Sequence, residues 1–204
     1  MLKKIMKITL ILVAILSIGL FIQHIYAKYL TVFQGKVVDA ASQAPLEGVA
    51  VVAVWNTERM SIAEGGWGIG YLKETLTDKN GEWKIKGESG HDIASNIMAV
   101  VTGFGTLFMA GTSVTKPPHF IFFKPGYCST PKGDGLKACE GMRYTYVDGK
   151  EILHLPKLND REDRLEVLPP PADGDRSKQK NFMKLINTER RSLGLDEFPL
   201  RDDQ

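Results

Sequence analysis

The sequence predicts a mainly β fold, a small antiparallel β-sandwich. Short segments rich in Val, Ile, Phe and Trp recur between residues 30 and 155, and these side chains suit the half-buried surface of a pleated sheet. Clusters of Gly, Pro, Asn and Asp separate the segments, as is typical of chain reversals. Two helical signals flank this pattern, so a hydrophobic helix is expected at the N-terminus and a short amphipathic helix near the C-terminus.

The first 28 residues have the layout of an export signal or a membrane anchor. Three lysines precede an uncharged apolar run over residues 8–22, which matches a basic region followed by a hydrophobic one. The basic residues hold that end in the cytoplasm, so the rest of the chain is expected beyond the membrane, facing the periplasm or cell exterior. A helix over residues 6–26 could span roughly 30 Å of hydrocarbon. Ala27 also offers a cleavage site, so a retained anchor and a cleaved signal both stay open.

Length and charge limit the rest of the molecule. Residues 29–156 have the length of one domain, and residues 157–204 form a charged, proline-rich linker and a helix. The formal net charge is only +2, so no surface for a polyanion is expected and nucleic acid is not a predicted partner.

The first two strands are predicted at residues 30–38 and 49–55. A polar turn and Pro45 separate them. Both alternating faces of the second segment are apolar, which is typical of a central strand covered on both sides.

A hairpin is predicted next, joining residues 71–77 to residues 82–85. Between them lies Asp78-Lys79-Asn80-Gly81, and Asn and Gly supply the positive φ angles that a tight reversal needs. The glycine-rich stretch of residues 65–70 is expected to be a loop between strands, because it lacks the Lys-Ser/Thr ending of a phosphate-binding loop.

The remaining strands are predicted after residue 118. Residues 119–123 form a short, very apolar strand that ends at Pro125-Gly126. Residues 143–147 and 151–155 flank Asp148-Gly149, which is the strongest two-residue hairpin signal in the chain.

Residues 87–118 are predicted to be an apolar insertion in the sandwich. Residues 93–115 carry no charge and include Phe104 and Phe108. A membrane span here would place the flanking strands on opposite sides of the bilayer, which a sandwich does not allow. We interpret the segment as a helix or long loop packed on the sandwich, with a membrane-surface or partner-docking patch as the alternative.

The two cysteines, Cys128 and Cys139, flank a turn-rich loop. In an oxidising compartment such a pair predicts a disulfide. A metal pair or a reactive thiol is the competing interpretation, but the sequence offers no additional His or Cys ligands in a suitable pattern.

The composition changes after residue 156. Residues 159–164 are highly charged, and three consecutive prolines at 169–171 favour an extended spacer. Apolar residues then recur at helical spacing, so an amphipathic helix is expected from about residue 176 to residue 193, ending before Gly194. This helix is expected to cover a sheet face or the insertion, with a dimer contact as the alternative.

Four motifs together are similar to the carboxypeptidase regulatory-like family. They are Gly35-x-Val37-x-Asp39, Pro45-Leu46-x-Gly48-Val49-x-Val51, Thr77-Asp78-x-x-Gly81-x-Trp83 and Pro125-Gly126-Tyr127. The resemblance covers roughly residues 31–127 and implies a transthyretin-like β-sandwich of about seven strands. It also implies a non-catalytic module, because these residues are structural in that family. The insertion, the cysteine loop and the tail depart from the family pattern, so any special role is expected there.

Catalysis is not predicted. No histidine has Glu at the third position after it, as a zinc carboxypeptidase requires, and no cofactor or metal site is expected. We therefore expect an exported, membrane-anchored module for binding or structural interaction in the cell envelope, with an envelope protein as a possible partner. Its oligomeric state is not predicted.

Four aromatic residues form the candidate binding surface, namely Trp67, Tyr71, Phe104 and Phe108. The alternative function is a carbohydrate-binding accessory domain that uses Trp67 and Tyr71, because an exposed indole beside glycines can stack on a sugar. A hydrolase built in the insertion is a third, weaker option.

Overall fold

The computed structural model describes residues 32–60, 66–87, 112–115, 117–172 and 176–199, together with Lys7, Thr9, Ser17 and Gly19, which are helical. The strands are β1 (Val32–Asp39), β2 (Ala50–Met60), β3 (Gly66–Leu76), β4 (Glu82–Lys86), β5 (Thr112–Thr115), β6 (His119–Phe123), β7 (Arg143–Val147) and β8 (Lys150–Leu155). The helices are α4 (Arg161–Glu166) and α5 (Lys180–Ser192), with single 3₁₀ turns η1 (Lys137–Cys139) and η2 (Arg176–Gln179).

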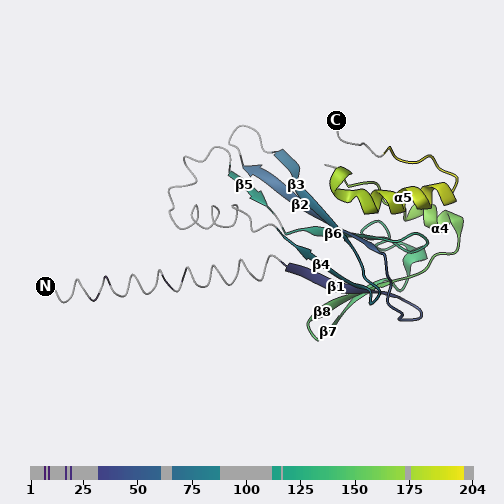
Figure 1. Cartoon of the computed structure of the whole chain (residues 1–204), viewed down its shortest axis with the longest axis horizontal. Coiled ribbons are helices and arrows are strands. Elements are labelled where there is room, and N and C mark those ends of the chain that lie inside the picture. Colours follow the sequence, from purple (N-terminus) through teal and green to yellow (C-terminus); the bar gives the residue numbers. More distant parts are fainter. Residues whose placement is uncertain are drawn as a thin grey trace.

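These strands form two sheets, which confirms the mainly β fold (Figure 1). One sheet has the order β4-β1-β8-β7. The other has the order β3-β2-β5, and β6 also pairs with β2. All strand pairs are antiparallel except β1 and β8, which are parallel. The prediction of a purely antiparallel fold is therefore wrong at this pair. Parallel neighbours need a long crossover, and here the crossover passes through the whole second sheet.

The predicted hairpin at residues 71–85 is also wrong. β3 pairs with β2 in one sheet, whereas β4 pairs with β1 in the other. The turn at Asp78–Gly81 therefore carries the chain from one sheet to the other. The Asp78 carboxylate accepts the backbone N–H groups of Asn80 and Glu82, both at 2.9 Å. Gly81 has φ of 72°, so the turn residues are those expected, but the sheets they join are not.

The described part of the glycine-rich stretch, residues 66–70, lies in strand β3 instead of a loop. Residues 66–69 pair with residues 56–59 of β2, and Gly70 is skipped where the register shifts. Strand β3 is an edge strand, and glycine inside a strand often marks a β-bulge. The register shifts between Trp55 and Asn56, which marks a β-bulge where the glycine-rich part of the pairing begins.

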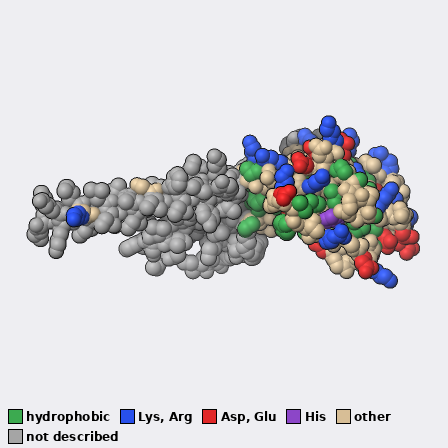
Figure 2. Space-filling view, turned by 90° about the horizontal axis from the view of Figure 1, so that it is seen from below, with side chains coloured by type: hydrophobic (Ala, Val, Ile, Leu, Met, Phe, Trp, Pro, Cys, Tyr) green, Lys and Arg blue, Asp and Glu red, His purple; other side chains and the backbone are tan. Residues whose placement is uncertain are grey.

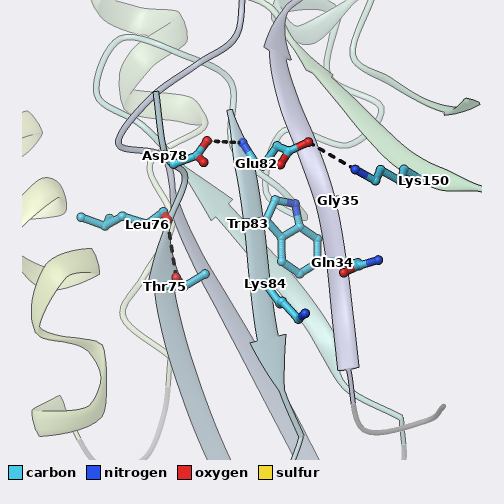
Figure 3. A pocket seen from close by; sticks show the side chains of 9 residues that line it. All are labelled: Gln34, Gly35, Thr75, Leu76, Asp78, Glu82, Trp83, Lys84 and Lys150. Carbon is cyan, nitrogen blue, oxygen red and sulfur yellow. Dashed lines mark hydrogen bonds and ion pairs between the residues drawn. The ribbon is translucent and has the colours of Figure 1, made fainter. Parts of the chain in front are cut away.

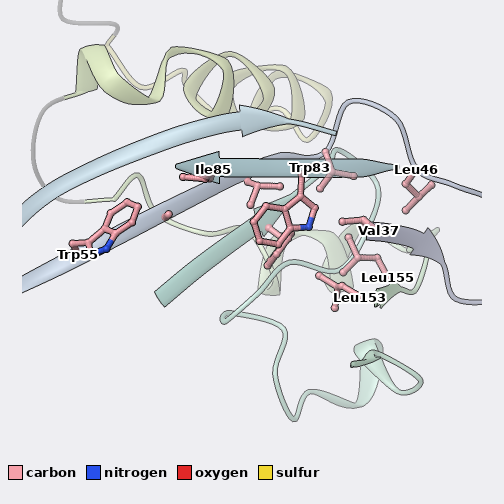
Figure 4. Packing of buried hydrophobic residues seen from close by; sticks show 11 residues of the cluster. Val37, Leu46, Trp55, Trp83, Ile85, Leu153 and Leu155 are labelled. Carbon is pink, nitrogen blue, oxygen red and sulfur yellow. The ribbon is translucent and has the colours of Figure 1, made fainter. Parts of the chain in front are cut away.

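One apolar cluster lies between the two sheets (Figure 4). From β2 it receives Val51, Ala53 and Trp55, and from the opposite sheet it receives Val37, Trp83, Ile85, Leu153 and Leu155. The alternate residues of β2, Ala50, Val52 and Val54, belong to a second cluster on the other face of the sheet. β2 is therefore covered on both sides, as its two apolar faces predict.

Helix α5 covers the outer face of the sheet that contains β2, and the amphipathic helix is confirmed (Figure 1). Phe182 and Ile186 are fully buried there, and the rings of Phe182 and Phe123 lie 5.9 Å apart, edge to face. The Glu74 carboxylate of β3 accepts the backbone N–H groups of Asn181 and Phe182. These contacts join the first turn of α5 to the sheet and compensate its unpaired N–H groups.

The predicted leader at residues 1–28 lies almost wholly outside the described residues. No described helix combines the length and the apolar composition that a membrane crossing requires. Most of the predicted insertion at residues 87–118 also lies outside the described part of the chain, apart from residue 87, β5 and residues 117–118.

Candidate binding surface

The exposed apolar side chains of the described residues gather on one strand. Four large apolar side chains are exposed, and three of them, Tyr144, Tyr146 and Val147, belong to β7. Tyr146 is 73% exposed and Val147 is 52% exposed. Viewed from below the orientation of Figure 1, where β7 and β8 lie lowest, apolar side chains are visible among the charged ones (Figure 2). We call Tyr144, Tyr146, Val147 and the outer backbone edge of β7 the β7 edge surface.

The hairpin of β7 and β8 has the predicted turn. Asp148 and Gly149 have φ angles of 51° and 73°, which is the type I′ conformation. Val147 and Lys150 close the hairpin, and the pairing continues to Arg143 opposite His154. The Asp148-Gly149 hairpin prediction is therefore confirmed.

β7 is the last strand of its sheet, and β8 is its only partner among the described strands. In a two-residue hairpin the closing pair is hydrogen-bonded, and bonded and non-bonded pairs then alternate along the ladder. Tyr146 and Tyr144 occupy the non-bonded pairs, opposite Glu151 and Leu153. Their backbone N–H and C=O groups consequently point away from β8, towards the open edge.

The two tyrosine side chains share the face of the sheet on which Leu153 lies, because residues directly opposite each other point to the same side. The Tyr146 hydroxyl donates a hydrogen bond to Oε1 of Glu151 at 3.1 Å. That bond and the negative charge of Glu151 raise the pKa of Tyr146. The ring of Tyr146 is thereby held at the edge of the sheet instead of being folded into the core.

The disulfide loop lies beside Tyr144. Cys128 and Cys139 are bonded, with their Cα atoms 5.8 Å apart, and the predicted disulfide is confirmed. A shallow pocket of about 610 Å³ is lined by residues 134–137 and 139–142 of the loop and by Tyr144. Burial raises the pKa of Tyr144 and, separately, the pKa of Asp134. Because Tyr144 lines the pocket, the pocket adjoins the β7 edge surface on the side of the disulfide loop.

Thr145 lies on the opposite face of β7, beside a buried histidine. Its Oγ1 is 2.9 Å from Nε2 of His154. Nδ1 of His154 has no hydrogen-bond partner, and it is the only such buried side-chain nitrogen or oxygen in the described part of the chain. Burial lowers the pKa of His154, and the positive charge of Arg143 lowers it further.

Of the four predicted surface residues, only Tyr71 has a side chain that lies in the described structure. The ring of Tyr71 is stacked on Trp55, with centroids 4.4 Å apart and planes at 16°, and Tyr71 packs against the central cluster. One face of Tyr71 is therefore already covered. The Trp67 side chain, Phe104 and Phe108 lie outside what the structure describes.

A hollow of about 430 Å³ beside β4 is lined by paired polar groups (Figure 3). The indole of Trp83 lies against Gly35, where an added Cβ would come within 3.0 Å of the indole nitrogen. Glu82 forms an ion pair with Lys150 at 3.3 Å, and the Asp78 carboxylate caps its own turn. Within the described ranges, no group of His, Cys, Asp and Glu is arranged to hold a metal ion.

The sequence predicts the strand β7 but does not predict that Tyr144, Tyr146 and Val147 are surface residues. The available signal was the run Arg143-Tyr144-Thr145-Tyr146-Val147. The two tyrosines share one face of this strand, and the other three residues share the opposite face. Such a run is equally typical of a buried strand, and only the sheet order places it at an edge.

Comparison with protein-family models, with curated proteins and with solved structures finds no match for this chain.

Proposed function

We propose that this chain is a non-catalytic binding module of the cell envelope, which recognises an extended protein segment by strand addition at β7. The observation that carries the proposal is the concentration of exposed tyrosine and valine side chains on a strand with an unpaired edge. Edge strands of soluble proteins are usually protected by charges, prolines or covering segments. On β7 only Arg143 is charged, and exposed apolar edges of this kind are typical of interaction sites.

Strand addition uses two kinds of contact, and β7 offers both. The outward N–H and C=O groups of Tyr144 and Tyr146 can continue the ladder with a segment of any sequence. The tyrosine rings on one face and the pocket under the disulfide loop can select among side chains of that segment. A rigid hairpin carrying these groups needs little reorganisation on binding.

The family, the type of fold and the location are part of the same proposal. Two sheets around one core, together with the turn motifs, support a transthyretin-like sandwich of the carboxypeptidase regulatory-like family. The basic and apolar N-terminal sequence supports export and a retained membrane anchor. A disulfide supports an oxidising compartment, and the periplasm or cell exterior is one.

A selection from a library of linear peptides tests the binding mode. The full chain in detergent is the target, and the variant Tyr146→Pro is the comparison. Proline removes the outward N–H of residue 146 but no bond between β7 and β8, and prolines are tolerated at sheet edges. Tyr146→Thr is the matched control, since it removes the ring and keeps the N–H.

We expect peptides with alternating apolar residues to be enriched on the wild-type chain. Their affinity should fall by about tenfold or more in Tyr146→Pro and by less in Tyr146→Thr. Enriched peptides that bind Tyr146→Pro as well as wild type would contradict strand addition. A selection that enriches no peptide at concentrations at which the chain is a monomer would contradict the function itself. Far-ultraviolet circular dichroism checks that each variant retains its strands.

A further inference from the structure

We infer that the segment added at β7 is the β7 strand of a second copy of this chain, which gives a two-fold symmetric dimer with one continuous sheet. The inference rests on the proposed function, because it names the partner of the same edge. A two-fold interface uses the same patch on both subunits, so that patch must complement itself. β7 has this property.

The sequence of β7 is nearly symmetric about Thr145. Antiparallel pairing centred on Thr145 places Tyr144 opposite Tyr146 of the second copy, and Tyr146 opposite Tyr144. Aromatic pairs across antiparallel strands are favourable. The same register places Arg143, the only charged residue of the strand, opposite Val147 of the second copy. No like charges then face each other, although self-pairing of a charged strand commonly brings them together.

The backbone geometry independently selects this register. Tyr144 and Tyr146 carry the outward N–H and C=O groups, and in this register each lies opposite the other, so that both form hydrogen-bonded pairs. A shift by one residue would place the outward N–H and C=O groups of one strand opposite backbone groups of the second copy that already bond to β8. It would also move every side chain of one strand to the other face of the sheet. Shifts by two residues keep the bonding pattern but pair fewer residues of the strand.

The exposed fractions of the β7 side chains in the single chain agree with an edge that a second copy covers. Tyr146 and Val147 are 73% and 52% exposed in the single chain, and both would lie within the paired segment. Tyr144 is 44% exposed, and its ring lines the pocket under the disulfide loop. The ring of Tyr146 from the second copy would lie beside Tyr144 at the mouth of this pocket. Two copies anchored in one membrane would meet at a raised effective concentration.

A cysteine at position 145 tests the geometry directly. On the two-fold axis the two Thr145 residues form a non-hydrogen-bonded pair, with Cα atoms about 4.5 Å apart. That distance lies within the range that a disulfide bridges, about 4.4 to 6.8 Å. We expect Thr145→Cys in the full chain to form a covalent dimer on mild oxidation, detected on a non-reducing gel.

Position 147 supplies the matched control. Val147 lies on the same face as Thr145, but its partner across the axis is Arg143. Val147→Cys alone should not cross-link, whereas a mixture of Val147→Cys and Arg143→Cys should do so. Analytical ultracentrifugation of the unmodified chain should show a monomer–dimer equilibrium. Tyr146→Pro should raise its dissociation constant by about tenfold or more.

The outcomes separate this inference from the proposed function. A dimer that cross-links at 145 and not at 147 alone, and that Tyr146→Pro dissociates, supports the inference. A monomer at every concentration with no cross-link at 145 overturns it, and the proposed function then stands if wild type still binds the selected peptides. Equal cross-linking at 145 and 147 indicates random collision and also overturns it. A monomer that binds no peptide overturns both.

Discussion

Arg164 and Glu189 form a nearly buried, bidentate ion pair between α4 and α5. Nε and one Nη of the arginine each donate to a different carboxylate oxygen at 2.7 Å. The side chain of Glu189 is 4% exposed and that of Arg164 is 24% exposed. The Glu189 carboxylate also accepts the backbone N–H of Gly126 at 3.2 Å. This one side chain therefore connects the charged tail, helix α5 and the turn after β6.

Replacing Glu189 with Gln should lower the free energy of unfolding by about 1.5 to 3 kcal/mol, because the arginine loses its charged acceptor while it remains largely covered. Urea denaturation measures the change. Glu197→Gln is the control, since Glu197 pairs with Arg191 on the surface and its loss should cost about 0.5 kcal/mol or less. Equal effects of the two substitutions would show that burial of the Arg164 pair is unimportant.

Gly81→Ala should be strongly destabilising. A Cβ at this position would meet the carbonyl oxygen of Val37, and the residue has φ of 72°. The positive φ costs about 1 kcal/mol for an alanine, and the backbone clash should bring the loss to more than about 2 kcal/mol. Thermal or urea unfolding measures it.

Gly194→Ala separates the two effects in that prediction. Gly194 has φ of 76°, but nothing lies within 4 Å of its added Cβ. Only the conformational cost of about 1 kcal/mol is expected there. If Gly81→Ala proved no worse than Gly194→Ala, the close contact between the intersheet turn and β1 would not exist in solution.

His154 should make the stability pH-dependent below about pH 6.5. Its pKa is lowered from the ordinary value of 6.5 by burial and then by Arg143, so the unfolded chain binds the proton more tightly than the folded chain does. Above the pKa of the unfolded chain, His154 is neutral in both states and does not lower the stability. As the pH falls below that pKa, the unfolded chain takes up the proton first and the free energy of unfolding decreases. Urea denaturation at a series of pH values measures this slope.

The variant His154→Gln identifies the group responsible. It keeps a polar side chain beside Thr145 but does not titrate, so the slope just below pH 6.5 should become smaller than in wild type. An unchanged slope would assign the pH dependence to other groups. A lower overall stability of the variant does not affect this comparison, because the slope is the quantity compared.

Removal of the disulfide should cost about 3 kcal/mol. The cysteines are 11 residues apart in the sequence, and closing a loop of that length restricts the unfolded chain by about this amount. The double variant Cys128→Ala/Cys139→Ala should therefore unfold at a lower urea concentration than wild type. Alkylation without a reductant is the direct check, and modification of both cysteines in the native chain would contradict the disulfide.

The sequence predicts local structure well where the signal is local. Asp148-Gly149 forms the expected turn because both residues adopt positive φ at low cost. β2 is central because both of its faces are apolar. Helix α5 forms within the predicted range of residues 176–193 because its apolar positions repeat at helical spacing. The turn at Asp78 is also placed correctly, since its carboxylate bonds to nearby backbone groups whichever strands follow.

Pairing between distant segments was not predictable in the same way. The same Asp78–Gly81 turn suits a hairpin or a passage between sheets. In the structure β4 pairs with β1 and Trp83 packs into the central cluster, which is the second arrangement. The glycine-rich residues 66–70 have a weak strand propensity, yet the neighbouring backbone of β2 includes them in the sheet.

The amino-acid sequence by itself determined the β-rich class, the turns, the amphipathic helix and the cysteine pair, because each depends on side chains close together in the chain or on composition. Only the tertiary structure decided which strands are neighbours, and thereby that Tyr144 and Tyr146 lie at an open edge while Tyr71 is stacked on Trp55. A side chain is exposed only where no other part of the chain packs on it, and the order of the strands determines which strands have neighbours on both sides.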